Sequence, residues 1–487
     1  MFMCCLNKMH RVQSRSIRRL RGFFLPALFC LAFIACSSTG AVKAPLAPRS
    51  FVPDSGPVAR HQLAQDVRAA FAHAWDGYKK YAWGYDELKP LSRKGYNWYG
   101  RSLFMTPVDA FDTMVLMGLT ADAREDKALI LGNLSFDEDI SVQVFEVTIR
   151  LLGGLLSAYE LDGDARFLAL ATDLGNRLLP AFDSKTGMPY RYVNLKTGKT
   201  QGDVSNPAEI GTLLLEFGTL SRLSGNPLYY EKARHAIVEL YNRRSRIGLV
   251  GSSINVNSGR WLDTESHIGG GIDSYYEYLL KGSILFGDAE LGAMWSTSIR
   301  AVNRYVADRR AFGLFYGHVD MNSGRLRAPL FGALEAYFPA VLALDGELGR
   351  AGELEDSCFA MWNLNGLEPE QFDYVTKSVT SPQYILRPEI AESAYYLYHF
   401  TQDPKYLRMG RTIFEDINAY CRTGAAFAEI ADVRTMQKQD RMQSFFLAET
   451  LKYLYLLFAP ADTLDFKSVI FNTEAHPLRI DAKVAPR

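Results

Sequence analysis

The stretch LDGDARFLALA, residues 161–171, contains the turn that decides the fold. A glycine can end one helix in the left-handed conformation, and the aspartate that follows it can cap the next helix. Related turns recur in LSGNPLYYEKA, LFGDAELGAMW, LDGELGRAGEL and FTQDPKYLRMG, which begin at residues 223, 285, 344 and 400. The sequence therefore predicts a repeated pair of helices joined by a tight turn.

The repeat has a nearly constant length. Its successive steps are 62, 62, 59 and 57 residues, measured between Gly163, Gly225, Gly287, Gly346 and Asp403. About 60 residues accommodate two helices and their loops, so residues 62–478 have room for about seven hairpins. Over this region helical periodicity is strong and strand signal is weak.

The end of the repeat region favours a closed ring. An open array of hairpins needs a polar last repeat, whereas residues 444–458, SFFLAETLKYLYLLF, are strongly apolar. We therefore predict an all-α fold, a closed α/α barrel of about seven hairpins.

Composition narrows the class of protein. The chain of 487 residues has 54 Lys and Arg against 54 Asp and Glu, which gives a net charge of zero. A nucleic-acid-binding protein needs a basic excess, so we expect no nucleic-acid partner. With 48% hydrophobic residues the chain can bury a large core, as ordinary globular proteins do. We expect a monomer.

The N-terminus has the pattern of a targeting segment. A basic stretch precedes FFLPALFCLAFIAC, an apolar run that is too short to span a membrane and is typical of an export signal. FIAC followed by SSTG resembles a bacterial lipobox in which Cys36 is lipidated. We predict a signal peptide over 1–36, a flexible tether over 37–61 and the barrel over 62–487. The expected location is the outer membrane, with the membrane contacted only through the lipidated N-terminus; an ordinary signal peptide is the alternative.

Histidine and cysteine do not show metal-ligand spacing. Beyond the targeting segment the cysteines are Cys358 and Cys421, and no zinc-type motif is present. A single disulfide between them is left open by the sequence.

Several predicted inner helices carry acidic residues where a buried helix should be apolar. Glu146 and Arg150 lie four residues apart on one face, and Asp273 follows three glycines at a predicted helix start. Taken singly, Asp273 can be a helix cap and Glu146 the partner of Arg150. Further acids stand at Asp109, Asp112, Glu209, Glu389, Glu392 and Glu449. Buried carboxylates are costly unless they are paired or bind a cation. Because the inner helices of a closed ring face one axial cavity, the acidic residues on them together predict a site for a hard cation and a polyhydroxylated ligand.

Taken together, these motifs resemble glycoside hydrolase family 47, the class I α-mannosidases. The resemblance extends in order over residues 62–478 and is carried by FEVTIRLLGGLLSAYEL, GGGIDSYYEYLLKG, LRPEIAES, SFFLAETLKYLYLLF and NTEAHP. IDSYYEYLLKGSILFGD is typical of the branch similar to ER degradation-enhancing mannosidases, and NTEAHP of the processing branch. The resemblance implies an (α/α)7 barrel plugged by a C-terminal hairpin. It also implies removal of terminal α-1,2-linked mannose from N-glycans or mannan, with inversion.

The resemblance implies a role for each polar residue. Glu146 would be the acid, Glu389 the base and Asp273 a third essential carboxylate whose role could be exchanged with that of Glu146. Calcium would be bound through the hydroxyl and carbonyl oxygens of Thr473. The side chains implied in holding the sugar or calcium-bound waters are Arg150, Glu209, Arg387, Glu392, Phe445, Glu449 and Glu474.

Two other classes of protein remain open. A mannose-binding lectin of the same fold would be catalytically silent, and binding alone would not need all three carboxylates. An epimerase or isomerase on a related α/α toroid would use histidine pairs as bases. Of the 8 histidines, His267 and His476 stand in family-like motifs.

Overall fold

The computed structural model describes residues 58–480. The predicted signal peptide, Cys36 and most of the predicted tether lie outside these residues. Helix α1 (Arg60–Ala82) begins two residues before the predicted start of the barrel. All described residues belong to one compact unit, Pro45–Arg487.

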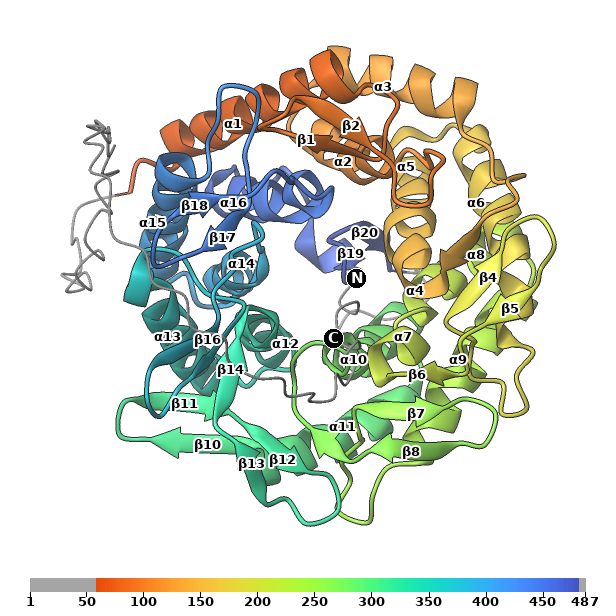
Figure 1. Ribbon diagram of the computed structural model, residues 1–487, viewed down its shortest axis with the longest axis vertical. Coiled ribbons are helices and arrows are strands. Elements are labelled where there is room, and N and C mark those ends of the chain that lie inside the picture. Colours follow the sequence, from red (N-terminus) through yellow and green to blue (C-terminus); the bar gives the residue numbers. More distant parts are fainter. Residues whose placement is uncertain (1–57, 481–487) are drawn as a thin grey trace, which may run out of the picture. The chain divides into compact units, whose positions relative to one another are not determined.

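The described residues form a ring of seven helical hairpins, each with an inner and an outer arm (Figure 1). The inner arms are α2 (Met105–Leu116); α4 (Val144–Val147), η1 (Thr148–Leu152) and α5 (Gly153–Asp162); α7 (Pro207–Gly211) and α8 (Leu214–Ser224); α10 (Asp273–Phe286); η3 (Ala333–Tyr337) and α12 (Phe338–Leu344); α14 (Glu389–Thr401); and η4 (Phe446–Thr450) and α16 (Leu451–Phe458). The outer arms are α3 (Thr120–Asn133), α6 (Ala165–Leu178) with η2 (Leu179–Phe182), α9 (Leu228–Tyr241), α11 (Ala289–Tyr305), α13 (Leu348–Asn365), α15 (Pro404–Tyr420) and α1.

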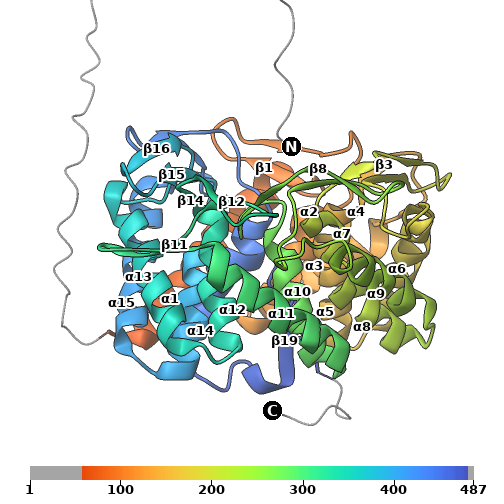
Figure 2. The same cartoon turned by 90° about the horizontal axis from the view of Figure 1, so that it is seen from below.

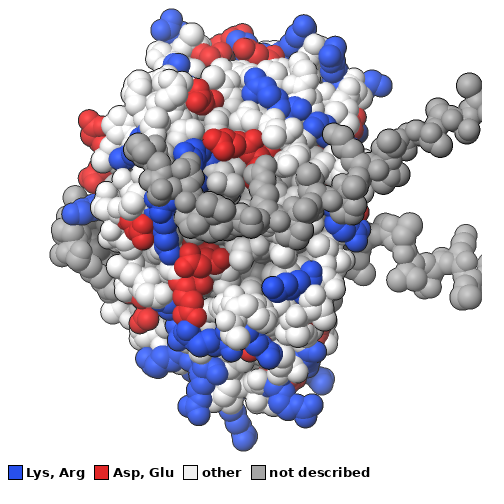
Figure 3. All heavy atoms as spheres, turned by 90° about the vertical axis from the view of Figure 1, so that its left-hand side faces the viewer, with Lys and Arg blue, Asp and Glu red and all other residues white. Residues whose placement is uncertain are grey.

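The first and last hairpins close the ring. Helix α1 packs against α16, and α2 packs against η4. The inner arms are apolar around most of their circumference because they lie between the axis and the outer arms. The outer arms are amphipathic, as α6 shows with Phe167, Ala171, Leu174 and Leu178 buried on one face. Charged side chains of both signs lie on the outer wall (Figure 3). The predicted closed (α/α)7 barrel is confirmed.

The turns between inner and outer arms have the predicted geometry, with one correction. The glycines of the first four turns have left-handed backbone, with φ of 83°, 74°, 66° and 89° at Gly163, Gly225, Gly287 and Gly346. In the fifth turn the left-handed residue is Gln402, with φ 56°. Asp403 lies one position later, where it caps α15 by accepting from the Lys405 amide at 2.8 Å. The last step of the repeat, from Gly346 to Asp403, therefore ends at the capping residue and not at the left-handed turn residue, Gln402.

The structure also contains twenty short strands, for which the sequence carried little signal. Each has two to four residues, too few for alternating polarity to be recognised. All of them pair antiparallel in small sheets, and apart from β19–β20 most of these sheets lie at one end of the ring (Figure 2). The strands are β1 (Glu87–Lys89), β2 (Lys94–Tyr96), β3 (Ser141–Gln143), β4 (Tyr192–Asn194), β5 (Thr200–Gln201), β6 (Val204–Ser205), β7 (Ser253–Asn255), β8 (Arg260–Asp263), β9 (Glu265–Ser266), β10 (Ala307–Arg310), β11 (Gly313–Tyr316), β12 (His318–Asp320), β13 (Leu326–Ala328), β14 (Leu330–Gly332), β15 (Gln371–Asp373), β16 (Ser378–Ser381), β17 (Ile430–Asp432), β18 (Gln437–Lys438), β19 (Val469–Phe471) and β20 (Pro477–Arg479).

The β19–β20 hairpin lies inside the ring (Figure 1). Its strands pair Val469 with Arg479 and Phe471 with Pro477, and they pack against α10 and α5. The short 3-10 helix η5 (Phe466–Ser468) leads into it. The residues between its strands, 472–476, are the NTEAH segment, so the C-terminal hairpin carries this motif into the barrel.

Two further sequence questions are answered by the described residues. Cys358 and Cys421 are both buried and free, so they form no disulfide. Between residues 58 and 480, no helix combines the length and the apolar character that crossing a membrane requires.

Candidate active site

Acidic side chains collect where inner helices begin. Asp273 and Glu389 are the first residues of α10 and α14, positions at which a helix dipole favours negative charge. Glu146 lies on α4, directly before the π-helical segment η1 that contains Arg150. A second π-helical segment, η4, contains Glu449. Such π insertions are frequent at functional sites because they change the direction in which side chains point.

Two residues with left-handed backbone flank the same region. Leu386 has φ 69° and Ala475 has φ 58°, a conformation that costs about 1–2 kcal/mol for a residue other than glycine. The Thr450 hydroxyl donates to the Leu386 carbonyl at 2.7 Å and so ties the segment before Glu389 to η4. Strain of this kind persists where the surrounding structure enforces it, often at active sites.

Arg150 joins three acidic side chains on one side of the site. Its Nε donates to Glu146 Oε2 at 3.1 Å, and its Nη1 forms an ion pair with Glu474. Nη1 also lies 3.6 Å from Asp109 Oδ2. All these groups except Glu146 are buried. Arg150 therefore holds Glu146 in place and connects it to the turn of the β19–β20 hairpin.

Arg387 organises the opposite side. It donates from Nε and Nη2 to Glu370 at 2.9 and 2.8 Å, a bidentate pair. Its Nη1 lies 3.7 Å from Glu389 Oε1. The other oxygen, Glu389 Oε2, is buried without a hydrogen-bond partner, which leaves it able to accept from a water or a sugar. The sequence pointed to Arg387 and Glu389 but missed Glu370, whose only signal was a second acid in LEPEQ.

Phe445 contacts the arginines of both halves of the site. The Cζ atoms of Arg150 and Arg387 each lie 5.7 Å from the centre of its ring. Arg150 Cζ also lies 5.3 Å from the centre of the Trp98 ring. These are cation–π contacts, and only 4% of the surface of Phe445 is exposed, so its ring packs chiefly against these arginines and the core.

Burial perturbs the carboxyl groups of the site. It raises the pKa of Asp273 and of Glu389 to about 7. It raises the pKa of Glu392 and of Glu474 to about 8. The pKa of Glu449 is raised well above its usual value by burial and then by the nearby charge of Glu474. The site thus has more carboxylates than its arginines neutralise, an excess that a bound cation or donating hydroxyls would relieve.

Asn472 fixes the turn of the β19–β20 hairpin. Its side-chain oxygen accepts from the amides of Glu474 and His476 at 3.0 and 2.8 Å. Its side-chain nitrogen donates to the Ile149 carbonyl in η1 and to Glu216 Oε1, at 2.9 and 2.8 Å. The hairpin and the helix that carries Arg150 are therefore held in register.

Thr473 lies at the tip of this turn and is half-buried. Its amide donates to the Tyr278 hydroxyl at 3.3 Å. The glycine pair in RLLGGLLS makes room for the turn, because a Cβ on Gly153 would lie 2.5 Å from Asn472 Nδ2. The glycine pair is therefore a sequence signal for the hairpin.

The floor beneath the turn is a charged network, which corrects one prediction. Lys452 Nζ lies 2.7 Å from Asp112 Oδ1, and His476 Nδ1 lies 2.7 Å from Asp112 Oδ2. His476 Nε2 lies 3.3 Å from Asp109 Oδ1. Asp109 and Asp112 are fully buried and hold the hairpin, so they do not belong to the predicted cation site. With both nitrogens occupied, His476 is unsuited to act as an epimerase base.

This network makes stability depend on pH. Burial lowers the pKa of His476, but Asp112 and Asp109 outweigh it and raise the value to about 9. The charged imidazole therefore stabilises the fold fully below the unfolded pKa of about 6.5, and this contribution is lost as pH rises through about 9. We expect the free energy of unfolding to fall by roughly 2–3 kcal/mol over this window. Chemical denaturation at a series of pH values measures it. His476→Gln should be less stable with a flatter profile; an unchanged slope would contradict the assignment.

Two predicted residues have partners that the sequence did not indicate. Glu209 accepts from Gln143 at 2.8 Å and pairs with Arg191 at 2.7 Å. Glu392 accepts from the Tyr453 hydroxyl at 3.2 Å and lies 4.0 Å from Lys281. Lys281 is paired in turn with Glu277, an i,i+4 pair in the apolar stretch YEYLLK. This pair has the same i,i+4 spacing as Glu146 and Arg150, so the sequence does contain a signal for it.

The tertiary structure also brings together a histidine cluster that the sequence did not indicate. Ligand atoms of Glu265, His267 and His318 lie within 4.8 Å of one another on and beside β9 and β12. The sequence predicted no such cluster because the two histidines are far apart along the chain. Three groups of this kind can in principle hold a metal ion.

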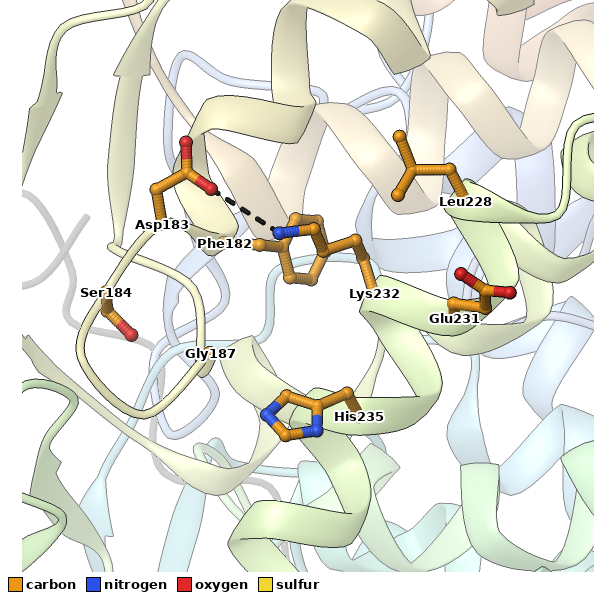
Figure 4. A pocket seen from close by; sticks show the side chains of 8 residues that line it. All are labelled: Phe182, Asp183, Ser184, Gly187, Leu228, Glu231, Lys232 and His235. Carbon is orange, nitrogen blue, oxygen red and sulfur yellow. Dashed lines mark hydrogen bonds and ion pairs between the residues drawn. The ribbon is translucent and has the colours of Figure 1, made fainter.

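A hollow of about 470 Å³ lies elsewhere, between η2 and α9 (Figure 4). Among the residues lining it are Asp183, Lys232 and His235. Lys232 Nζ lies 3.4 Å from Asp183 Oδ1, and His235 Nε2 lies 3.1 Å from the Thr186 carbonyl. The hollow contains none of the carboxylates described above, so it is separate from the candidate site.

The fold and this arrangement of acids and arginines are those of a glycoside hydrolase on an α/α barrel. Residues 70–480 match glycosyl hydrolase family 47, and the chain belongs to that family.

Two curated proteins and one solved structure show the range of its similarities. ER degradation-enhancing alpha-mannosidase-like protein 2 of Mus musculus is 39% identical over 447 residues, 85% of this chain and 77% of the relative. Mannosyl-oligosaccharide 1,2-alpha-mannosidase IB of Homo sapiens is 38% identical over 448 residues, 85% of this chain and 69% of the relative. The solved alpha-1,2-mannosidase from Trichoderma reesei has a TM-score of 0.80 and 30% identity, and the match covers 86% of this chain and 99% of that one.

Proposed function

We propose that this protein is a calcium-dependent, inverting α-1,2-mannosidase that removes terminal mannose from mannose-rich oligosaccharides. One observation carries the proposal. Glu146 and Glu389 are held by different arginines, Arg150 and Arg387, and each of these arginines contacts the ring of Phe445. Two separated carboxyl groups are what inversion requires, one to protonate the leaving oxygen and one to activate water on the other face of the sugar. The linkage is supported by similarity to the α-1,2-mannosidases named above.

Glu389 is the proposed base. Burial raises its pKa to about 7, which matches a group that must gain a proton near neutral pH. Its unpartnered Oε2 can accept the hydrogen of the attacking water. Glu146 is the proposed proton donor and, like Asp273, is more exposed than Glu389.

Asp273 remains the alternative donor. Asp273 is half-buried, and desolvation raises its pKa to about 7, so a substantial fraction is protonated at neutral pH. Its Oδ1 accepts from the Ser274 amide at 2.8 Å, and the Tyr337 hydroxyl donates to its carbonyl at 2.8 Å. These bonds fix its position whichever role it takes.

The proposed metal ligand is Thr473, through its hydroxyl and carbonyl oxygens. The surrounding donors are oxygens of Glu392, Glu449 and Glu474, and calcium prefers oxygen ligands. The raised pKa values of these buried acids also fit a site that is completed by a cation. Calcium, when bound, supplies positive charge to which two sugar hydroxyls can coordinate. Glu209 is proposed to contact the sugar at the rim.

The decisive experiment is incubation with α-1,2-mannobiose, with and without a chelator. We expect the protein to release free mannose, to lose this activity on chelation and to regain it when Ca²⁺ is added. Full activity after exhaustive chelation would refute calcium dependence. Binding without release of mannose would favour a lectin-like protein of the same fold, and an altered sugar would favour an epimerase. Size-exclusion chromatography tests the expected monomer.

We also propose that Cys36 is lipidated and anchors the domain to the outer membrane of a Gram-negative cell. The lipobox-like FIAC motif and the apolar segment before it support this. Cys36→Ser is expected to move the protein from the membrane fraction to the soluble fraction. A wild-type protein that is already soluble, with a first residue other than Cys36 by mass spectrometry, would show a different signal.

A further inference from the structure

The cluster of Glu265, His267 and His318 lies on one face of a small sheet. Val319 on β12 pairs with Ser266 on β9, which places His318 beside His267 across the two strands. The two imidazole rings stack, with centroids 4.3 Å apart and planes 14° apart. His318 Nδ1 is hydrogen-bonded to Glu265 Oε1. The tertiary structure therefore assembles a polar group that neither strand forms alone.

His318 lies between two carboxylates. Its Nε2, on the other side of the ring, is 3.6 Å from Glu335 Oε1. Both His318 and Glu335 are buried. An imidazole with a carboxylate on each side is stabilised in the doubly protonated form, because the positive charge is then attracted by both carboxylates.

The geometry does not favour a shared metal ion. The Gly269 amide donates to His267 Nδ1 at 3.1 Å. The lone pair of Nδ1 is therefore in use, and in the neutral ring Nε2 carries the hydrogen. Burial and the neighbouring His318 lower the pKa of His267 to about 3, so it is neutral. His267 thus has no free lone pair for a metal and instead supplies a neutral ring against which His318 stacks.

The cluster is connected to Asp273 through Gly269. The Gly269 carbonyl accepts from the amides of Ile272 and Asp273, both at 3.0 Å, and so forms the turn that begins α10. Glu335 packs directly on this turn, because a Cβ on Gly269 would lie 2.1 Å from Glu335 Oε1. His267 holds the Gly269 amide and His318 is paired with Glu335, so both histidines act on the same residue.

From these contacts we propose that His318 is a positioning residue: as an imidazolium between Glu265 and Glu335, it holds Glu335 against Gly269 and sets the geometry and local charge of Asp273. The proposal rests on the proposed function, in which Asp273 is an essential carboxylate. The charged groups around His318 are consistent with a positively charged imidazole at this position. Glu265 and Asp263 lie on its sheet side, Glu335 on η3, and Asp320 on its own strand is paired with Arg327 at 2.5 Å.

The sign of the effect on Asp273 follows from these charges. Glu335 raises the pKa of Asp273, after the larger effect of burial. Without the imidazolium the charge of Glu335 is uncompensated, so His318→Gln should raise the pKa of Asp273 further. Glu335→Gln removes the negative charge itself and should lower it. A variant carrying both changes should lie close to the wild type, because the effects oppose each other.

The experiment measures kcat/KM on mannobiose against pH for the wild type, the two single variants and the double variant. The limb that reports Asp273 should move by about 0.5–1 pH unit, upward in His318→Gln and downward in Glu335→Gln. Shifts in the same direction, or losses of activity without a shift, would show that the residues are merely structural and would overturn the proposal.

Two controls separate this proposal from the alternatives. NMR of histidine-labelled protein, with His318 assigned from the His318→Gln spectrum, should show a charged His318 and a neutral His267 near neutral pH. This readout needs no mannosidase activity, so a neutral His318 overturns the inference even if the proposed function fails. If Zn²⁺ binds with a stoichiometry that His318→Gln abolishes, the cluster is a metal site and the imidazolium assignment is wrong.

Discussion

Glu389→Gln is expected to lower kcat by about 10²–10⁴-fold, the usual contribution of a general base. The amide keeps the shape of the side chain but cannot accept a proton from water. Glu389 Oε2 has no hydrogen-bond partner among the described residues, and Arg387 keeps its bidentate pair with Glu370. We therefore expect little change in fold or in sugar binding.

The measurements are kcat on α-1,2-mannobiose and the dissociation constant of mannose by calorimetry. Glu355→Gln is the matched control, because Glu355 is also fully buried and both its oxygens are without partners, but it lies on the outer arm α13. Burial raises the pKa of Glu355 well above its usual value, so an uncharged amide is a close substitute there and kcat should not change. A loss of binding equal to the loss of rate in Glu389→Gln would place Glu389 in substrate binding.

Glu146→Gln is expected to lower kcat on mannobiose by a similar factor, about 10²–10⁴-fold. The loss should shrink on a mannosyl fluoride or an activated aryl mannoside, because those leaving groups need no proton. Arg150 should remain paired with Glu474 in this variant, so the plug and its turn are preserved. Stability is therefore expected to change little.

Asp273→Asn measured in parallel decides which acid is the proton donor. If Asp273→Asn is rescued by the activated substrates and Glu146→Gln is not, the two roles are exchanged. The anomeric proton followed by NMR during early turnover should show β-mannose first, since a single displacement inverts the anomeric centre. α-Mannose appearing first would mean a retaining path and would refute both assignments.

The sequence by itself determined the architecture, because helices and their turns depend on neighbours close in the chain. Gly163 and Gly225, which have left-handed backbone in the structure, can be recognised as helix ends without knowledge of the rest of the fold. The apolar inner helices are legible by periodicity. The i,i+4 spacing of Glu146 and Arg150 also predicted their contact. Strands of two to four residues carried too little pattern to be predicted.

Only the tertiary structure decided how these parts combine into a site. Glu370 meets Arg387 because the long connection between α13 and α14 folds back on itself. Phe445, directly before η4, contacts both Arg150 and Arg387, which lie far apart in the sequence. No local pattern marks such partners. Asp112 looked like a site carboxylate in the sequence but neutralises Lys452 and His476 beneath the plug. Charged groups are costly to bury alone, so their function follows from the partner that packing brings to them, and that partner can lie hundreds of residues away.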